Sequence, residues 1–95
     1  MDSKSRVLFW LLSASRGAST RRKILFLLNK KPYNIRKLSL ELNLDYKSVK
    51  GHIDLLNKYE ILDAVGGKYG RVYFISPQWE DNEFLKKILF KGGGV

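Results

Sequence analysis

Apolar residues recur along this chain mainly at the spacing of an α-helix. The pattern predicts helices over residues 6–13, 20–30, 35–42, 46–59 and 77–90. In the second of these, residues 24–28 are apolar on every side, and such a helix is buried on every side. We therefore expect helix 20–30, capped by Ser19 or Thr20, to be the central helix of the fold.

Residues with strong capping and turn preferences mark the ends of three helices. Asn34 and Asp45 stand just before helices 35–42 and 46–59, where their side-chain oxygens can accept hydrogen bonds from free backbone N–H groups. Asn43 tolerates the left-handed backbone conformation, so it fits a tight turn between these two helices. Ser76 and Pro77 suit the cap and the first position of the last helix.

The pattern changes from helical to β-rich after helix 46–59. Residues 61–65 and 71–75 flank a five-residue segment with three glycines, which predicts a β-hairpin. Two short helices, a tight turn and a following hairpin make a winged helix-turn-helix. The predicted fold class is mainly α with a small β-hairpin (α+β). We expect one domain over residues 1–95, with the helix-turn-helix at 35–59, the wing at 61–75 and further helices at both ends.

Positive charge is concentrated in the first part of the chain. The 95 residues carry a formal net charge of +9. Residues 1–37 hold ten Lys or Arg and one acidic residue, whereas residues 38–95 hold eight basic and eight acidic residues. Such an asymmetry indicates a polyanionic partner, and a solvated basic surface is the alternative.

The chain lacks the residue types that most enzymes and metal sites need. It has no Cys and one His, which excludes disulfides, thiolate zinc sites, a cysteine nucleophile and multi-histidine metal sites. Glycines 66, 67 and 70 lie between two strands and not before a helix, so they are not a nucleotide-binding loop. We expect no enzymatic activity, cofactor or metal. The longest apolar run has six residues, against ~20 for a membrane span. We therefore expect no membrane segment or secretory signal, and a cytoplasmic protein associated with the nucleoid.

The helix-turn-helix region resembles that of ArsR-like winged-helix transcriptional regulators, and especially small archaeal winged-helix proteins. The similar stretches are LSLELNLDYKSVKGHIDLL at 38–56, and IL at 61–62 leading into YFIS at 73–76. FWLL at 9–12, with Arg16 and Gly17, is similar to the N-terminal part of the archaeal proteins. The resemblance implies a dimeric DNA-binding protein whose second motif helix enters the major groove. Metal-sensing members carry cysteines in the recognition region, and their absence here argues against a metal-responsive switch.

Basic and polar residues on three elements are candidates for contact with double-stranded DNA. The first turn and outer face of helix 46–59 are expected to meet base edges. Basic residues at the start of helix 35–42 are expected to hold phosphates, and those of the wing to reach phosphate or the minor groove. The alternatives are an ordinary polar helix face and a wing that contacts protein. The candidates are Tyr46, Lys47, Ser48, Lys50 and Gly51 on the helix, Arg36 and Lys37 before it, and Lys68, Tyr69 and Arg71 in the wing.

Some charged residues occupy positions in the predicted helices that are electrostatically unfavourable without a partner. Arg36 and Lys37 oppose the macrodipole at the start of their helix, which suggests a nearby anion. Residues 21–23 do the same in the central helix, and are either a second anion contact or plain surface charge. Asp54 would repel phosphates, so we expect it to pair with Lys50 or Lys58.

Two further positions of helix 46–59 have open explanations. Gly51 costs ~1 kcal/mol relative to Ala inside a helix, which is explained either by close approach to DNA or by simple tolerance. His52 lies on the core side, and we expect a packed histidine with one hydrogen bond.

The terminal helices look too apolar for the periphery of a small monomer, which predicts a homodimer. A two-fold dimer would present two recognition helices to successive major grooves, ~34 Å apart. Packing within one chain is the alternative. The expected interface residues are Val7, Leu8, Trp10, Leu11, Phe84, Leu85, Ile88 and Leu89.

Three functions remain open at this point. The first is a transcriptional regulator that reads duplex DNA with helix 46–59, and the second is a sequence-tolerant chromatin-type DNA-binding protein. The third is a winged helix used for protein interaction, against which the basic residues at 36, 37, 47, 50, 68 and 71 argue.

Overall fold

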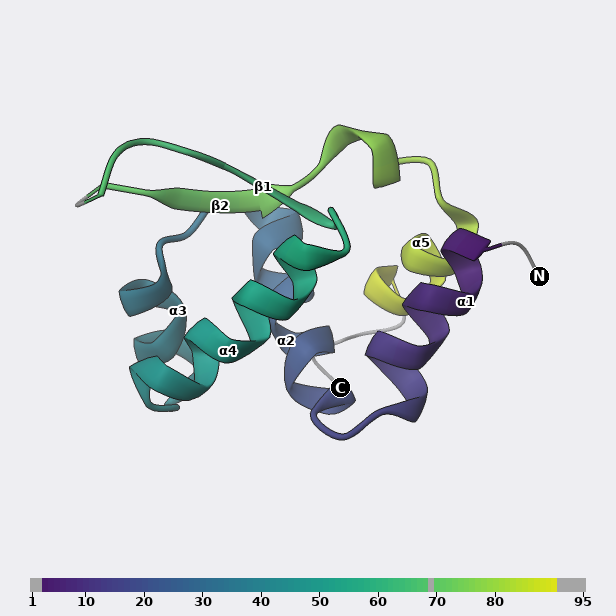
Figure 1. The fold of residues 1–95 in the computed structure, drawn as a ribbon, viewed down its shortest axis with the longest axis horizontal. Helices are drawn as coiled ribbons and strands as arrows, with labels where there is room; N and C mark the ends of the chain where they lie inside the picture. Colours follow the sequence, from purple (N-terminus) through teal and green to yellow (C-terminus); the bar gives the residue numbers. More distant parts are fainter. Residues whose placement is uncertain (1–2, 69, 91–95) are drawn as a thin grey trace.

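The fold is built around one central helix, with a helix-turn-helix on one side and the first and last helices on the other (Figure 1). The computed structural model describes residues 3–68 and 70–90. The central helix is α2 (Ala18–Lys30), which contacts α3, β2, α5 and the turn η1 before it. Ile24, Leu25 and Leu28 are buried and Phe26 and Leu27 are partly buried, so the prediction of a central helix is confirmed.

The helix-turn-helix consists of α3 (Ile35–Leu42) and α4 (Tyr46–Lys58). Asn34 Oδ1 accepts a hydrogen bond from the backbone N–H of Lys37 at 2.7 Å, and Asp45 Oδ2 accepts one from Ser48 at 3.0 Å. Asn43 has a φ of 54° and a left-handed conformation. Both predicted caps and the predicted turn residue are therefore confirmed.

The wing is a two-stranded antiparallel hairpin of β1 (Leu62–Val65) and β2 (Val72–Ile75), close to the predicted strands. On its other side, β2 bonds to the segment between α2 and α3, because Tyr33 and Tyr73 exchange backbone hydrogen bonds of 3.1 and 2.8 Å. At the loop, Gly66 has a φ of +100°, and a Cβ there would collide with the carbonyl oxygen of Gly70. The turn therefore requires glycine at this position.

The N-terminal segment differs from the predicted helix 6–13. It begins earlier as α1 (Ser3–Phe9) and continues as a π-helical turn, η1 (Trp10–Ala14). Gly17, with a φ of +84°, is the N-cap residue of α2, so neither Ser19 nor Thr20 caps that helix as predicted.

The single C-terminal helix predicted over 77–90 is wrong. The chain forms a short 3₁₀ turn, η2 (Pro77–Trp79), and then a separate helix, α5 (Glu83–Phe90). Trp79 is 3% exposed and its Nε1 donates to the carbonyl of Glu60 at 2.9 Å, which holds η2 against the end of α4. Asn82 caps α5 by accepting from the N–H of Leu85 at 3.0 Å, whereas Ser76 makes no side-chain capping bond.

Both terminal helices use part of their apolar stripes inside the chain. Leu8 and Leu11 are fully buried, and Leu85 and Leu89 are 2% and 8% exposed, because they join the core around α2. Half of the residues predicted at a dimer interface are thus already covered. Val7, Phe84 and Ile88 remain partly exposed, and Trp10 is 47% exposed.

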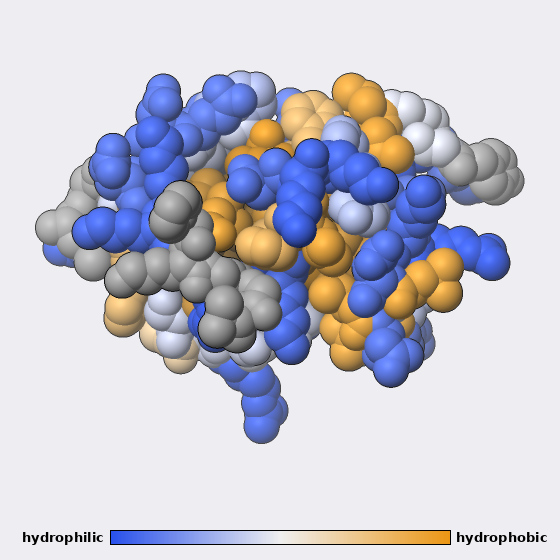
Figure 2. All heavy atoms as spheres, turned by 180° about the vertical axis from the view of Figure 1, so that it is seen from behind, coloured by the Kyte–Doolittle hydropathy of each residue, from blue (hydrophilic) through white to orange (hydrophobic). Residues whose placement is uncertain are grey.

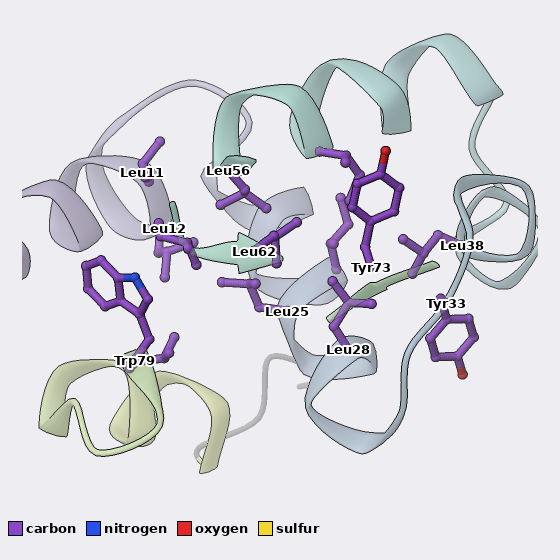
Figure 3. Close-up of a cluster of buried hydrophobic side chains, with 14 of the residues drawn as sticks. Leu11, Leu12, Leu25, Leu28, Tyr33, Leu38, Leu56, Leu62, Tyr73 and Trp79 are labelled. Carbon is purple, nitrogen blue, oxygen red and sulfur yellow. The ribbon is translucent and has the colours of Figure 1, made fainter. Parts of the chain in front are cut away.

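One hydrophobic core connects these elements. Leucines of η1, α2, α4 and β1 converge with Trp79 near one end, and Tyr33, Leu38 and Tyr73 extend the core toward the wing (Figure 3). Each fully buried aliphatic side chain contributes roughly 1.5–3 kcal/mol. Within the described part of the chain, no helix is long and apolar enough to cross a bilayer.

Candidate nucleic-acid interface

The outer face of α4 is the best-defined exposed basic surface of the helix-turn-helix. Val49, Ile53 and Leu56 point into the core with 0% exposure. Lys47 and Lys50 are exposed on the opposite side, and Tyr46 is 53% exposed in the first turn. This agrees with the outer face predicted from the sequence, since its candidates are all exposed: Tyr46, Lys47, Ser48, Lys50 and Gly51.

Ser48 is less free to read a base than its exposure suggests. Its hydroxyl donates to Asp45 Oδ1 at 2.7 Å, and its backbone N–H donates to Oδ2. These bonds from Ser48 lower the pKa of Asp45, so the carboxylate stays charged. While it holds this cap, Ser48 offers DNA only acceptor lone pairs, and donation from its hydroxyl to a base requires the cap to open.

Lys50 makes an ion pair on the same face. Its Nζ lies 2.8 Å from Asp54 Oδ2, four residues along α4. The hydrogen bond to Asp54 raises the pKa of Lys50, so the ammonium remains protonated. Of the two partners predicted for Asp54, Lys50 is therefore the one that it bonds, while Lys58 lies over the ring of Tyr59.

Gly51 has no side chain, so the surface of α4 beside this ion pair is open. It is exposed, and a Cβ added there would have no atom within 4 Å. Packing within the chain therefore does not explain the glycine. Both explanations open from the sequence, tolerance of the glycine and close approach of DNA, are compatible with this open surface.

The basic residues of α3 and the wing flank α4. Arg36 and Lys37 are exposed in the first turn of α3, and Lys68 and Arg71 are exposed in the hairpin loop. The hairpin tip extends over the α3 end of the molecule, away from α1 and α5 (Figure 1). All four side chains are thus accessible, which the predicted contacts with DNA require, and Tyr69 lies outside the described residues.

An apolar rim at the turn of the motif was not predicted. Leu40 is 71% exposed and Leu44 is 38% exposed, and Tyr46, two residues after Leu44, is 53% exposed. Leu44 belongs to the apolar pattern of the helix-turn-helix, which on its own would place it between the two helices. The residue instead follows the left-handed turn at Asn43, which directs the chain outward before α4 begins.

Arg21 is the residue whose role the sequence analysis missed. It is 3% exposed, and its guanidinium donates to the carbonyls of Leu11 at 2.8 Å and Arg16 at 2.9 Å, and to the hydroxyl of Ser15. It is therefore neither an anion contact nor surface charge. Its spacing to Ile24, Leu25 and Leu28 on the core side of α2 is the signal that could have revealed this.

His52 completes the Arg21 cluster. Arg21 Nη1 lies 3.1 Å from His52 Nδ1, and this confirms the expected packed histidine with one hydrogen bond. Burial lowers the pKa of His52, and the charge of Arg21 lowers it further. The ring is therefore neutral near pH 7, and Nδ1 accepts while Nε2 carries the proton.

Comparisons with known proteins support the architecture. No protein-family model and no curated protein matches the sequence. Among solved structures, the chain is similar to the adhesin competence repressor of Streptococcus pyogenes, with a TM-score of 0.61 and 22% identity. The similarity covers 93% of this chain and 65% of the repressor chain. The fold is a winged helix-turn-helix. This agrees with the fold class predicted from the sequence, in which helices dominate and one hairpin forms the wing.

Proposed function

We propose that this winged helix-turn-helix binds double-stranded DNA as a homodimeric transcriptional regulator, with α4 in the major groove. The outer face of α4 carries the proposal, because it presents Lys47 and Lys50 on a helix whose other side is fixed in the core. An α-helix fits the major groove, and lysine donates to the guanine acceptors O6 and N7. We further propose that the protein is related to the ArsR-like regulators and their small archaeal members, and that it is located on the nucleoid. The proposal assigns the chain no catalytic activity.

The flanking charges suit the phosphate backbone on both sides of such a helix. Arg36 and Lys37 lie at the start of the first motif helix, which crosses the backbone in helix-turn-helix complexes. Lys68 and Arg71 lie on the wing beyond it. Each phosphate neutralised contributes about −0.9 to the slope of log K against log salt, so binding should weaken steeply with salt.

The homodimer is proposed from apolar surface that residues 3–68 and 70–90 leave uncovered. Phe9 and Trp10 are 46% and 47% exposed on the α1–η1 segment. A groove of about 790 Å³ lies among α2, β2 and α5 and is lined mainly by apolar residues, including Leu28, Phe74 and Leu85. Apolar side chains reach the surface on the face opposite Figure 1, among hydrophilic ones (Figure 2). These surfaces border the predicted terminal elements and support a dimer through them.

A titration of the whole chain against a pool of random duplexes tests the proposal. A sharp consensus with two-fold symmetry is expected for the regulator. Strong binding to all sequences alike would indicate a sequence-tolerant chromatin protein instead. No binding would indicate a winged helix used for protein interaction. Lys47→Ala should lower the affinity, whereas Lys30→Ala at the end of α2 serves as a control that removes the same charge outside the candidate DNA and dimer surfaces.

A further inference from the structure

The outer face of α4 presents a hydrogen-bond donor and an acceptor side by side. Lys50 Nζ and Asp54 Oδ2 lie 2.8 Å apart, and the two side chains are 52% and 57% exposed. Gly51 stands on the same face and adds no side chain between the helix backbone and an approaching surface. Both members of the pair are therefore accessible while they remain bonded to each other.

The major-groove edge of a G·C pair offers the complementary arrangement. Guanine O6 is an acceptor and cytosine N4 is a donor. The two atoms are joined by a base-pairing hydrogen bond and so lie ~2.9 Å apart. This spacing matches that of the Lys50 and Asp54 atoms. The ammonium can face O6 and the carboxylate can face N4 at the same time, without separating the ion pair.

The number of donors on lysine favours G·C over A·T. An ammonium has three N–H donors, of which Asp54 uses one. Guanine presents two neighbouring acceptors, N7 and O6, which can take the other two. In an A·T pair, the acceptor O4 of thymine has the C5-methyl group beside it, so one N–H of Lys50 would be left facing an apolar group.

We propose that the Lys50–Asp54 pair reads one G·C base pair in each half-site, with Lys50 on guanine and Asp54 on cytosine. The inference rests on the proposed function, because it needs α4 in the major groove. Gly51 has a defined part in it, since the flat face beside the pair allows the base edges to come within hydrogen-bond distance. Asp54 is then a specificity residue. Its negative charge weakens binding to the phosphates, and its carboxylate discriminates between base pairs.

The test is the change in base preference when Asp54 is removed. Asp54→Ala should lower the preference for G·C over the reversed C·G pair at one position of each half-site by about tenfold, because the carboxylate accepts from cytosine N4 and repels guanine O6. The preference for G·C over A·T comes from Lys50 and should remain. The affinity of the variant for random duplex should stay the same or rise, because a negative charge facing the phosphates is lost. The control is Asp81→Ala, which breaks the exposed Lys86–Asp81 pair of 3.7 Å outside α4 and removes the same charge. It should leave the preference unchanged.

A modified base tests the Lys50 contact without any change in the protein. Replacing that guanine by 7-deazaguanine removes N7 and leaves base pairing intact, so binding by the unaltered chain should weaken several-fold. Lys50→Met should not respond to the same replacement. If Asp54→Ala keeps the full preference for G·C over C·G, or if 7-deazaguanine has no effect, the inference is overturned while DNA binding stands. Absence of duplex binding by the unaltered chain would overturn both.

Discussion

Arg21 on α2 donates a hydrogen bond to His52 on α4, with 3.1 Å between Nη1 and Nδ1. Because arginine stays protonated in proteins, the bond exists only while His52 is neutral at Nδ1. The central helix and the proposed recognition helix are thus joined by a bond whose acceptor can titrate.

This bond predicts that stability falls at mildly acidic pH. The pKa of folded His52 is lowered, chiefly by burial, so the native state binds fewer protons than the unfolded state, in which histidine titrates near ~6.5. The contribution is complete above that pH and is lost as the pH falls through the folded pKa. Urea unfolding at pH 7.5 and 5.5 should show the loss, and His52→Gln, which cannot titrate, should show a smaller one. An equal loss in both proteins would contradict the assignment.

Gly17→Ala is expected to destabilise the fold strongly. Gly17 has a φ of +84°, and a Cβ there would lie 2.7 Å from His52 Cε1 and 3.0 Å from Arg21 Nη1. Backbone strain and the clash together should cost about 1–3 kcal/mol of unfolding free energy. Gly67→Ala is the matched control, because its Cβ would meet nothing within 4 Å. Thermal unfolding of the two variants gives the comparison, and similar midpoints would refute it.

Gly51→Ala should separate stability from DNA binding. The new methyl group points into open space, so the variant should gain up to ~1 kcal/mol of stability from helix propensity. The same methyl group would stand between α4 and a base edge, so duplex affinity should fall. Unfolding and binding titrations on one preparation measure both effects. A variant that is more stable and binds equally well would show that the helix backbone does not approach DNA.

Trp10→Lys should convert the proposed dimer to a monomer without unfolding the chain. The ring is 47% exposed and makes an edge contact with Tyr59, so its loss should cost little within one chain. Sedimentation equilibrium should give twice the 11.0 kDa chain mass for the unaltered protein and the single mass for the variant. Leu40→Lys is the control, since this 71% exposed leucine lies on α3, away from the terminal helices. A single chain mass for the unaltered protein would contradict the dimer proposal.

The features predicted correctly from the sequence depend on short-range chemistry. A cap acts within three residues, so Asn34 and Asp45 could be assigned from their positions alone. The left-handed turn at Asn43 and the exposed side of α4 follow from single-residue preference and helical period. The pairing of Asp54 with a lysine four residues away is local in the same sense.

The features that were missed depend on partners far away in the sequence. The break in the last helix follows from the bond of Trp79 to Glu60, 19 residues earlier. The buried guanidinium of Arg21 donates to Leu11, Ser15 and Arg16, 5 to 10 residues earlier, and to His52, which is 31 residues away. Leu8, Leu11, Leu85 and Leu89 show the same limit, because an apolar stripe does not reveal whether it will meet its own chain or a second one.

The hydrogen bonds between Tyr33 and Tyr73 restrict how the wing can move. They attach β2 to the residue immediately before Asn34, the cap of α3. The hairpin therefore cannot swing as an independent flap, because any tilt of β2 pulls on the first turn of α3, where Arg36 and Lys37 lie. A force on the wing is therefore passed to the first turn of α3 through these two bonds, so DNA that contacts both elements would act on them together.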